Sequence, residues 1–212
     1  MEKTNINPNN KEIKNIVFDL GGVIVNLNEE KCKAAFEKIG ADMIVHRWPD
    51  RKFDDIVNAA NSGRLDAKAF CQKVRELGDF YARDQEIMWA WNELLMPIRE
   101  EKRELLLSLG SKYRLFLLSN TNDIHWDKCA EQLLPVRRYY AEDYFEKIFL
   151  SYKMRLLKPS TDIFAQMIIE SDIDPKDTLY IDDTESNCRM ARRLGFEVLH
   201  ETTGDDWMKC FK

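Results

Sequence analysis

The strongest constraint on the fold is a series of short runs rich in β-branched and aromatic residues. The first run ends at Gly21-Gly22, which indicates a buried strand followed by a sharp turn. Helical patterns separate the later runs, and strands that alternate with helices predict a parallel sheet covered on both faces. The predicted strands are 15–20, 113–118, 147–150, 178–181 and 196–199.

The stretch from residue 27 to residue 96 differs, because it has helical periodicity in several pieces and no clear strand. Asp66 is a plausible N-cap within it, and Pro97 closes it. We therefore predict an α/β protein with a Rossmann-like parallel sheet core (1–26 and 97–212) and an inserted helical cap (27–96). The cap helices are predicted at 29–39, 51–61, 67–77 and 85–95, and two core helices at 162–170 and 185–194.

Composition narrows the ligand and the compartment. The formal net charge is −5 with scattered Lys and Arg, which argues against a nucleic-acid surface. Five widely spread cysteines without a Cys-x-x-Cys pair indicate reduced thiols. There is no apolar run near the roughly 20 residues of a membrane helix and no secretory signal. We expect a cytoplasmic protein with a small-molecule ligand and no membrane partner, and the sequence leaves its oligomeric state open.

Polar side chains stand at or just beyond several predicted strands, where an open parallel sheet gathers its ligands. Asp19 ends the first strand, Ser119-Asn120 the second and Asp182-Asp183 the fourth, and Lys158 lies on the loop after the third. Each could be a turn, capping or solvated residue if it stood alone. Their shared position instead favours a site for phosphoryl transfer, a reaction that needs positioning and charge neutralisation.

These residues also carry a resemblance. Residues 17–23 (Val-Phe-Asp-Leu-Gly-Gly-Val) resemble the first signature of the haloacid dehalogenase superfamily, and residues 118–120 resemble the second. Lys158-Pro159 and 181–183 resemble the third and fourth, so the match spans the chain from 16 to about 200. The chain is most similar to the subgroup with bacterial glucose-1-phosphate phosphatases and the N-terminal phosphatase domain of soluble epoxide hydrolases.

The resemblance implies a Mg²⁺-dependent phosphatase for a small phosphorylated metabolite. Asp19 would attack phosphorus and become an aspartyl phosphate, which water then hydrolyses. Mg²⁺ would be held by Asp19, the backbone carbonyl of Gly21 and Asp183. Asp182 would stand in the outer shell of the metal.

The resemblance assigns further roles around this centre. The Ser119 hydroxyl and the Asn120 amide would hold phosphoryl oxygens, and Lys158 would neutralise the charge that builds in the transition state. Asn187, one turn into the following helix, would orient the acidic pair.

The sequence departs from the family pattern at Gly21, where the commonest first signature has a second aspartate that acts as general acid. A chain without this acid is expected to favour easily departing leaving groups, such as a sugar 1-phosphate. His125 is the nearby ionisable group that could replace the acid. The alternative is a structural histidine that faces solvent or packs on Trp126.

A second departure is Arg155, where related sequences often place glycine. It is either an extra phosphate contact or a solvated loop residue. Two other functions stay open: a dehalogenase that uses the same aspartate on carbon, and a catalytically impaired phosphate-binding regulatory protein. The Asp182-Asp183 pair argues against the first, because that chemistry needs no metal.

Overall fold

The computed structural model describes residues 13–48, 50–133 and 141–211. Its centre is a sheet of five parallel strands in the order β3-β2-β1-β4-β5, so the predicted parallel sheet is confirmed. All five predicted strands are present, with ends that shift by one or two residues. They are β1 (Asn15–Phe18), β2 (Arg114–Ser119), β3 (Lys147–Leu150), β4 (Thr178–Asp182) and β5 (Glu197–His200).

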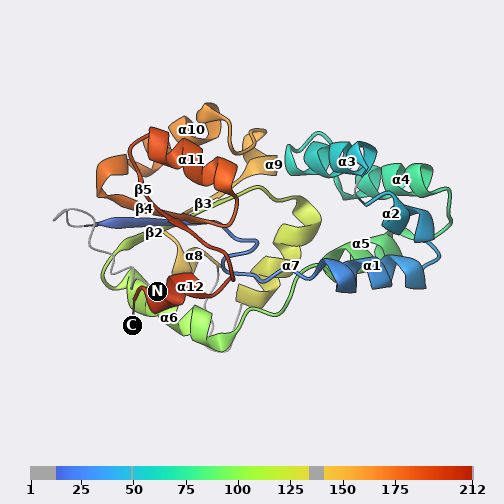
Figure 1. Ribbon diagram of the computed structural model, residues 1–212, viewed down its shortest axis with the longest axis horizontal. Helices are drawn as coiled ribbons and strands as arrows, with labels where there is room; N and C mark the ends of the chain where they lie inside the picture. The colour runs from blue at the N-terminus through green and yellow to red at the C-terminus, as the bar shows by residue number, and fades with distance from the viewer. Residues whose placement is uncertain (1–12, 49, 134–140, 212) are drawn as a thin grey trace.

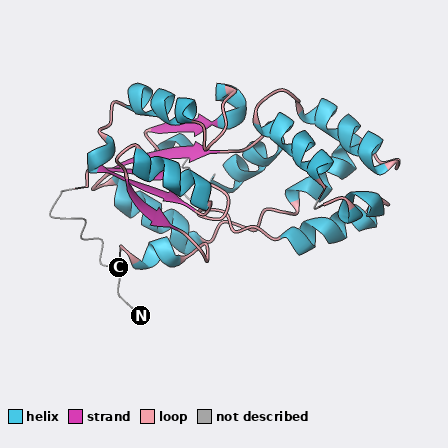
Figure 2. Ribbon diagram, turned by 45° about the horizontal axis from the view of Figure 1, so that its top comes forward, coloured by secondary structure: helices cyan, strands magenta, loops and turns pink. Residues whose placement is uncertain are grey.

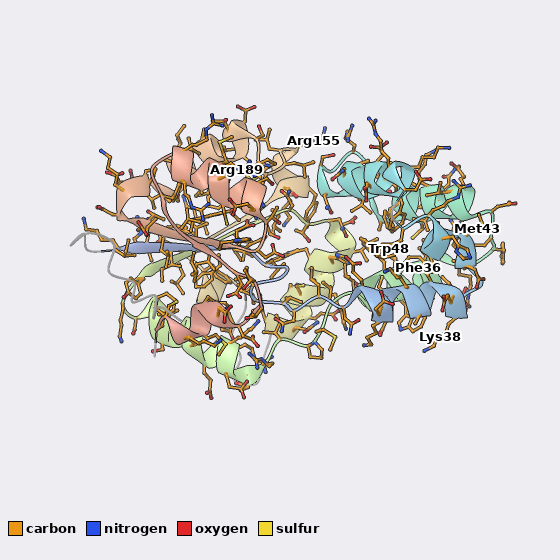
Figure 3. The ribbon with its side chains drawn as sticks, in the orientation of Figure 1. Phe36, Lys38, Met43, Trp48, Arg155 and Arg189 are labelled. Atoms are coloured by element: carbon orange, nitrogen blue, oxygen red, sulfur yellow. The ribbon has the colours of Figure 1, made fainter. Side chains whose placement is uncertain are left out.

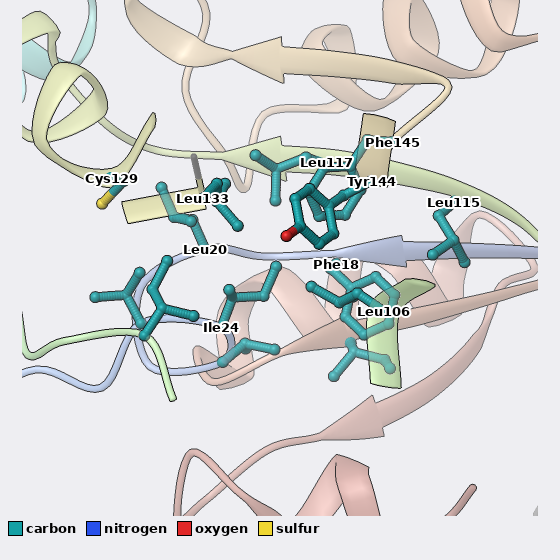
Figure 4. Close-up of a cluster of buried hydrophobic side chains, with 14 of the residues drawn as sticks. Phe18, Leu20, Ile24, Leu106, Leu115, Leu117, Cys129, Leu133, Tyr144 and Phe145 are labelled. Carbon is teal, nitrogen blue, oxygen red and sulfur yellow. The ribbon is translucent and has the colours of Figure 1, made fainter. Parts of the chain in front are cut away.

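Both faces of the sheet are buried, and the alternation along β1 shows how. Ile16 and Phe18 pack into one apolar cluster, whereas Val17 packs into another on the opposite face. Figure 4 shows the first cluster around Phe18 and Leu117. In Figure 1 helices α10 and α11 cover one face, and α6, α8 and α12 lie on the other.

The core helices have the following bounds: α6 (Glu100–Gly110), α7 (Asp123–Leu133), α8 (Ala141–Tyr144), α9 (Ser151–Met154), α10 (Thr161–Ser171), the 3₁₀ helix Pro175–Asp177, α11 (Glu185–Arg193) and α12 (Asp206–Lys209). Within the residues that the structure describes, no helix is long and apolar enough to cross a membrane.

The insert after β1 is all helical among its described residues, and Figure 2 shows it gathered beside the sheet. It has an apolar core of its own, in which Phe36 and Trp48 lie 6.2 Å apart between ring centroids (Figure 3). Asp66 caps its helix as expected, by accepting from the Ala69 N–H. Its helices are α1 (Glu29–Lys38), α2 (Asp42–His46), α3 (Arg51–Asn61), α4 (Ala67–Gly78) and α5 (Asp84–Asn92).

The chain leaves the core and returns to it at one place. Leu27 and Leu95 form an antiparallel bridge between the two connecting segments. The Asn28 N–H donates to the Leu94 carbonyl at 2.8 Å, and the Met96 N–H donates to the Asn26 carbonyl at 2.9 Å. The predicted boundaries at 26/27 and 96/97 fall on this pair of segments, and the division into two domains stays a prediction.

Candidate active site

Sheet register brings the expected carboxylates together. Asp19 directly follows β1 and Asp182 ends the neighbouring β4, with Phe18 opposite Ile181 in the register. Ligand atoms of Asp19, Asp182 and Asp183 all lie within 4.8 Å of one another. Adjacent parallel strands ending at one edge therefore produce a concentrated negative charge from residues that are far apart in sequence.

The ammonium group of Lys158 sits among these acids. Its Nζ lies 3.0 Å from Asp19 Oδ2 and 2.7 Å from Asp182 Oδ2, and it donates to the Leu118 carbonyl at 2.8 Å. Burial by itself lowers the pKa of Lys158, but the carboxylates of Asp182 and Asp19 outweigh it and raise that pKa. Lys158 is thus a buried, charged lysine that forms an ion pair with Asp19, the proposed nucleophile.

Asp182 is fully buried and surrounded by donors. Besides Lys158, it accepts from the Tyr180 hydroxyl at 2.5 Å, the Thr184 N–H at 2.8 Å and the Asn187 amide at 3.0 Å. Burial raises the pKa of Asp182, yet the attraction of Lys158 and these hydrogen bonds lower it overall. The contact expected of Asn187 is present, and the Tyr180 contact is one that sequence reasoning missed.

Asp183 differs from Asp182 in being only half-buried. Its Oδ1 accepts from the Thr184 hydroxyl at 3.2 Å, and burial followed by the charge of Asp182 raises its pKa. Its Oδ2 lies against Gly22, where an added Cβ would come within 2.0 Å of that oxygen. Gly22 also has a φ of +70°, so it serves both the turn and the close approach of Asp183.

Asp19 is 7% exposed, and its Oδ1 accepts from the Leu20 N–H at 2.7 Å. Burial, with added repulsion from Asp182 and Asp183, raises the pKa of Asp19 to about 7 despite the opposing effect of Lys158. If all three carboxylates are ionised, they carry two more negative charges than the one ammonium balances, and the repulsion among them is part of what raises the pKa of Asp19. Oxygen donors with this charge balance fit a hard divalent cation such as Mg²⁺.

The predicted phosphate-binding residues adjoin this cluster. Ser119 ends β2 and is 2% exposed. The Asn120 side chain is engaged twice with the main chain of Lys158: its Nδ2 donates to the carbonyl at 3.0 Å, and its Oδ1 accepts from the N–H at 2.9 Å. Its side-chain amide therefore fixes the Lys158 loop, which leaves its backbone N–H as the amide that could hold a phosphoryl oxygen.

A cavity of about 160 Å³ opens between the core and the insert. Core residues Gly21 and Ser119 line it, and so do Asn61 and Trp91 of the insert. An added Cβ at Gly21 would lie 3.5 Å from Leu27 Cδ1, an ordinary contact distance, so a side chain could begin there against Leu27, and no acidic side chain is present at this position. Asn61 and Trp91 were not among the sequence-predicted site residues.

His125 lines the same cavity, but neither of its two expected environments is correct. The ring stacks on Trp91, with 4.6 Å between centroids and 16° between planes, and is 8% exposed. Its Nε2 lies 3.1 Å from the Trp91 carbonyl, to which only an N–H can donate. Burial lowers the pKa of His125 to about 4, so the ring is neutral at neutral pH. Its single ring N–H is already used in the hydrogen bond to the Trp91 carbonyl. Both features count against His125 as the replacement acid.

Arg155 lies apart from the cavity lining and is exposed, labelled near the insert in Figure 3. Its φ of +57° falls in the left-handed region that favours glycine. The solvated alternative describes its environment, and the backbone explains why related sequences often place glycine there.

Comparison with known families identifies this arrangement. The family of haloacid dehalogenase-like hydrolases matches residues 13–195. The chain belongs to this hydrolase family. The subgroup named from the sequence, with its glucose-1-phosphate phosphatases, stays a prediction.

Two relatives of this hydrolase are from Bacteroides thetaiotaomicron. The chain is 34% identical to a D-ribitol-5-phosphate phosphatase over 198 residues. This alignment covers 92% of this chain and 95% of the phosphatase. A crystal structure of a haloacid dehalogenase family enzyme is 40% identical with a TM-score of 0.91, over 95% of this chain and all of the other. A second structure of that enzyme, in complex with magnesium and inorganic phosphate, has a TM-score of 0.88 at 40% identity, over 94% of this chain and all of the other.

A more distant structure is an L-2-haloacid dehalogenase from Xanthobacter autotrophicus. It is 19% identical with a TM-score of 0.61, over 89% of this chain and 77% of the other. At this identity the likeness shows a shared fold and says nothing about the reaction.

Proposed function

We propose that this hydrolase is a magnesium-dependent phosphatase that hydrolyses a small phosphomonoester through an aspartyl phosphate on Asp19. The observation that carries the proposal is the buried cluster of three carboxylates around the single ammonium of Lys158. A divalent cation would relieve the repulsion among these carboxylates and hold them ionised, and the family relationship supplies the hydrolytic reaction. The related enzyme solved with magnesium and inorganic phosphate supports the same ligands here.

Asp19 is the nucleophile in this proposal. Its carboxylate forms a bond to phosphorus in line with the ester bond that breaks, and the leaving oxygen departs with the electron pair of that bond. Water then cleaves the acyl phosphate, which releases inorganic phosphate and restores the carboxylate. Lys158, held 3.0 Å from Asp19 Oδ2, neutralises the charge on the phosphoryl oxygens.

Asp19, Asp183 and the Gly21 carbonyl would hold Mg²⁺, which supplies further positive charge to the phosphoryl group when bound. Asp183 is assigned as a ligand because it is half-buried and has few protein donors. Asp182 already accepts from Lys158, Tyr180 and other donors, so we place it in the outer shell. In that place it holds Lys158 against the nucleophile.

Two arguments point to different substrates within the same class. The curated relative acts on D-ribitol 5-phosphate by name, an ester of a primary alcohol. The lack of an acidic side chain at Gly21 instead favours a leaving group that needs no protonation, such as the anomeric oxygen of a hexose 1-phosphate. Both are small hydroxylated phosphomonoesters, and we propose this class for the chain. Rates on the two esters decide between them.

Neither alternative function has a comparable observation behind it. Dehalogenation on carbon needs no metal, whereas Asp19 and Asp183 bring carboxylate oxygens within 4.8 Å of each other, and the dehalogenase structure shows only a shared fold. An impaired regulatory protein would have no need to keep Asp19, Lys158 and the acidic pair in bonded contact.

The test is hydrolysis of p-nitrophenyl phosphate in Mg²⁺ and in excess EDTA, with Asp19→Asn as the matched variant. We expect turnover with Mg²⁺, loss of turnover in EDTA, and no activity in Asp19→Asn with its thermal unfolding unchanged. Equal rates with and without the metal, or full activity in Asp19→Asn, would contradict the proposal.

A further inference from the structure

Asn61, which the proposed reaction does not use, reaches the cavity from the insert. It ends α3 and is tied to the core twice. The Ser151 hydroxyl donates to its carbonyl at 2.6 Å, and the Asn122 amide donates to its Oδ1 at 2.9 Å. The side chain is therefore fixed in place although it belongs to the insert.

The orientation of the Asn61 amide follows from a chain of two hydrogen bonds that begins at a backbone donor. The His125 N–H donates to Asn122 Oδ1 at 3.0 Å, and a backbone N–H cannot accept. The Nδ2 of Asn122 must then face Asn61, so Asn61 presents its oxygen there and turns its own Nδ2 aside. Within the described residues no hydrogen bond engages that Nδ2, so its two N–H groups are free, and Asn61 is one of the residues that line the cavity.

Of the other ring nitrogens on residues that line the cavity, that of His125 is a further polar group, whereas that of Trp91 is closed off from solvent. His125 gives its Nε2 proton to the Trp91 carbonyl, so its Nδ1 carries a lone pair and accepts. The indole N–H of Trp91 is buried and has no hydrogen-bond partner among the described residues. The remaining walls are mixed: Leu20, Leu27 and Val57 are apolar, whereas the segment 119–122 is polar.

This combination selects a chemical class. A hydroxyl group both donates and accepts, so it matches a fixed amide donor near a neutral acceptor, and the apolar walls match the carbon chain. A volume of about 160 Å³ corresponds to about five waters, which is enough for a short hydroxylated carbon chain.

We propose that Asn61 is a specificity-determining residue that donates from its Nδ2 to a hydroxyl oxygen in the alcohol part of a short polyol or sugar phosphate. This inference rests on the proposed function, since the phosphoryl group is placed at Asp19. It assigns substrate choice to a side chain that the insert brings to the core.

The test uses Asn61→Asp, which keeps the oxygen that accepts from Asn122 and replaces only the free donor. Binding of D-ribitol 5-phosphate and of inorganic phosphate is measured by calorimetry with Mg²⁺, in an Asp19→Asn background that prevents turnover. The matched control is Asn58→Asp, the same change at an exposed position of α3. Asn61→Ser serves as a second variant without added charge.

We expect both Asn61 variants to weaken D-ribitol 5-phosphate binding by about tenfold more than inorganic phosphate binding, the scale of one hydrogen bond. A new carboxylate would repel the phosphate group of both ligands, so its effect largely cancels in the ratio of the two affinities. Asn58→Asp should leave this ratio unchanged. An unchanged ratio in the Asn61 variants would overturn the inference. Absence of hydrolysis by the wild type would reject the proposed function instead, because the binding ratio needs no turnover.

Discussion

The acidic cluster at the strand ends and the cavity beneath the insert are built in opposite ways. In the cluster, Asp182 and Lys158 are buried and each is held by several bonds. In the cavity, a few polar atoms such as Asn61 Nδ2 stand among apolar walls. The difference indicates that the sheet fixes the chemistry, whereas contacts between core and insert fix which molecule receives it. Changes in the cluster should therefore act on every substrate alike.

The largest effect is expected from Lys158→Met. Removing the ammonium leaves Asp19 and Asp182 buried without their cation and removes charge neutralisation at the phosphoryl group. We expect kcat/KM to fall by about 100- to 1,000-fold on both D-ribitol 5-phosphate and p-nitrophenyl phosphate. The control is Lys153→Met, an exposed lysine on α9. A loss below tenfold, or one confined to a single substrate, would break the comparison.

Gly22→Ala tests whether the turn exists to admit Asp183. The new methyl group would meet Asp183 Oδ2 at 2.0 Å, so the carboxylate must move. We expect Mg²⁺ activation to require about 10- to 100-fold more metal, the usual scale for disturbing the support of a ligand. Gly40→Ala is the matched control, because Gly40 has a φ of +75° with nothing within 4 Å. Equal metal requirements in the two variants would mean that Gly22 is needed only for its backbone conformation and not for the approach of Asp183.

No effect on the reaction itself is expected at His125, where the change is in stability. The pKa of His125 falls from 6.5 to about 4 on burial, so below pH 6.5 the unfolded chain binds a proton that the folded protein does not. Stability should therefore fall as pH drops from 6.5 to 4, by on the order of 3 kcal/mol from this group. His125→Gln should show a shallower loss in urea unfolding across that range. Parallel pH profiles for the two proteins would rule out this contribution.

The sequence predicted the cluster better than the cavity, for a physical reason. Parallel strands end at one edge, so Asp19, Asp182 and Lys158 could be brought together from chain order alone. Tyr180 could have been found too, because it lies two residues before Asp182 on the same side of β4. The Gly22 contact with Asp183 needed the path of the turn, which a glycine pair does not specify.

The cavity residues had no such signal. Asn61 ends α3 and Trp91 packs in the insert's core, so helical periodicity accounts for both without a binding site. Their second role depends on how the insert packs on the core, through contacts such as Trp91 with His125. Helix α2 was likewise not predicted from the sequence, because a helix of five residues has little periodicity to detect.

The central claim is that Asp19 carries the phosphoryl group. The direct measurement is acid quenching of the enzyme during turnover of p-nitrophenyl phosphate with Mg²⁺, followed by mass spectrometry of its peptides. The account predicts a phosphorylated peptide that contains Asp19, lost on treatment with hydroxylamine and absent from Asp19→Asn. Steady turnover with no phosphate on that peptide, or phosphate on another residue, would contradict it.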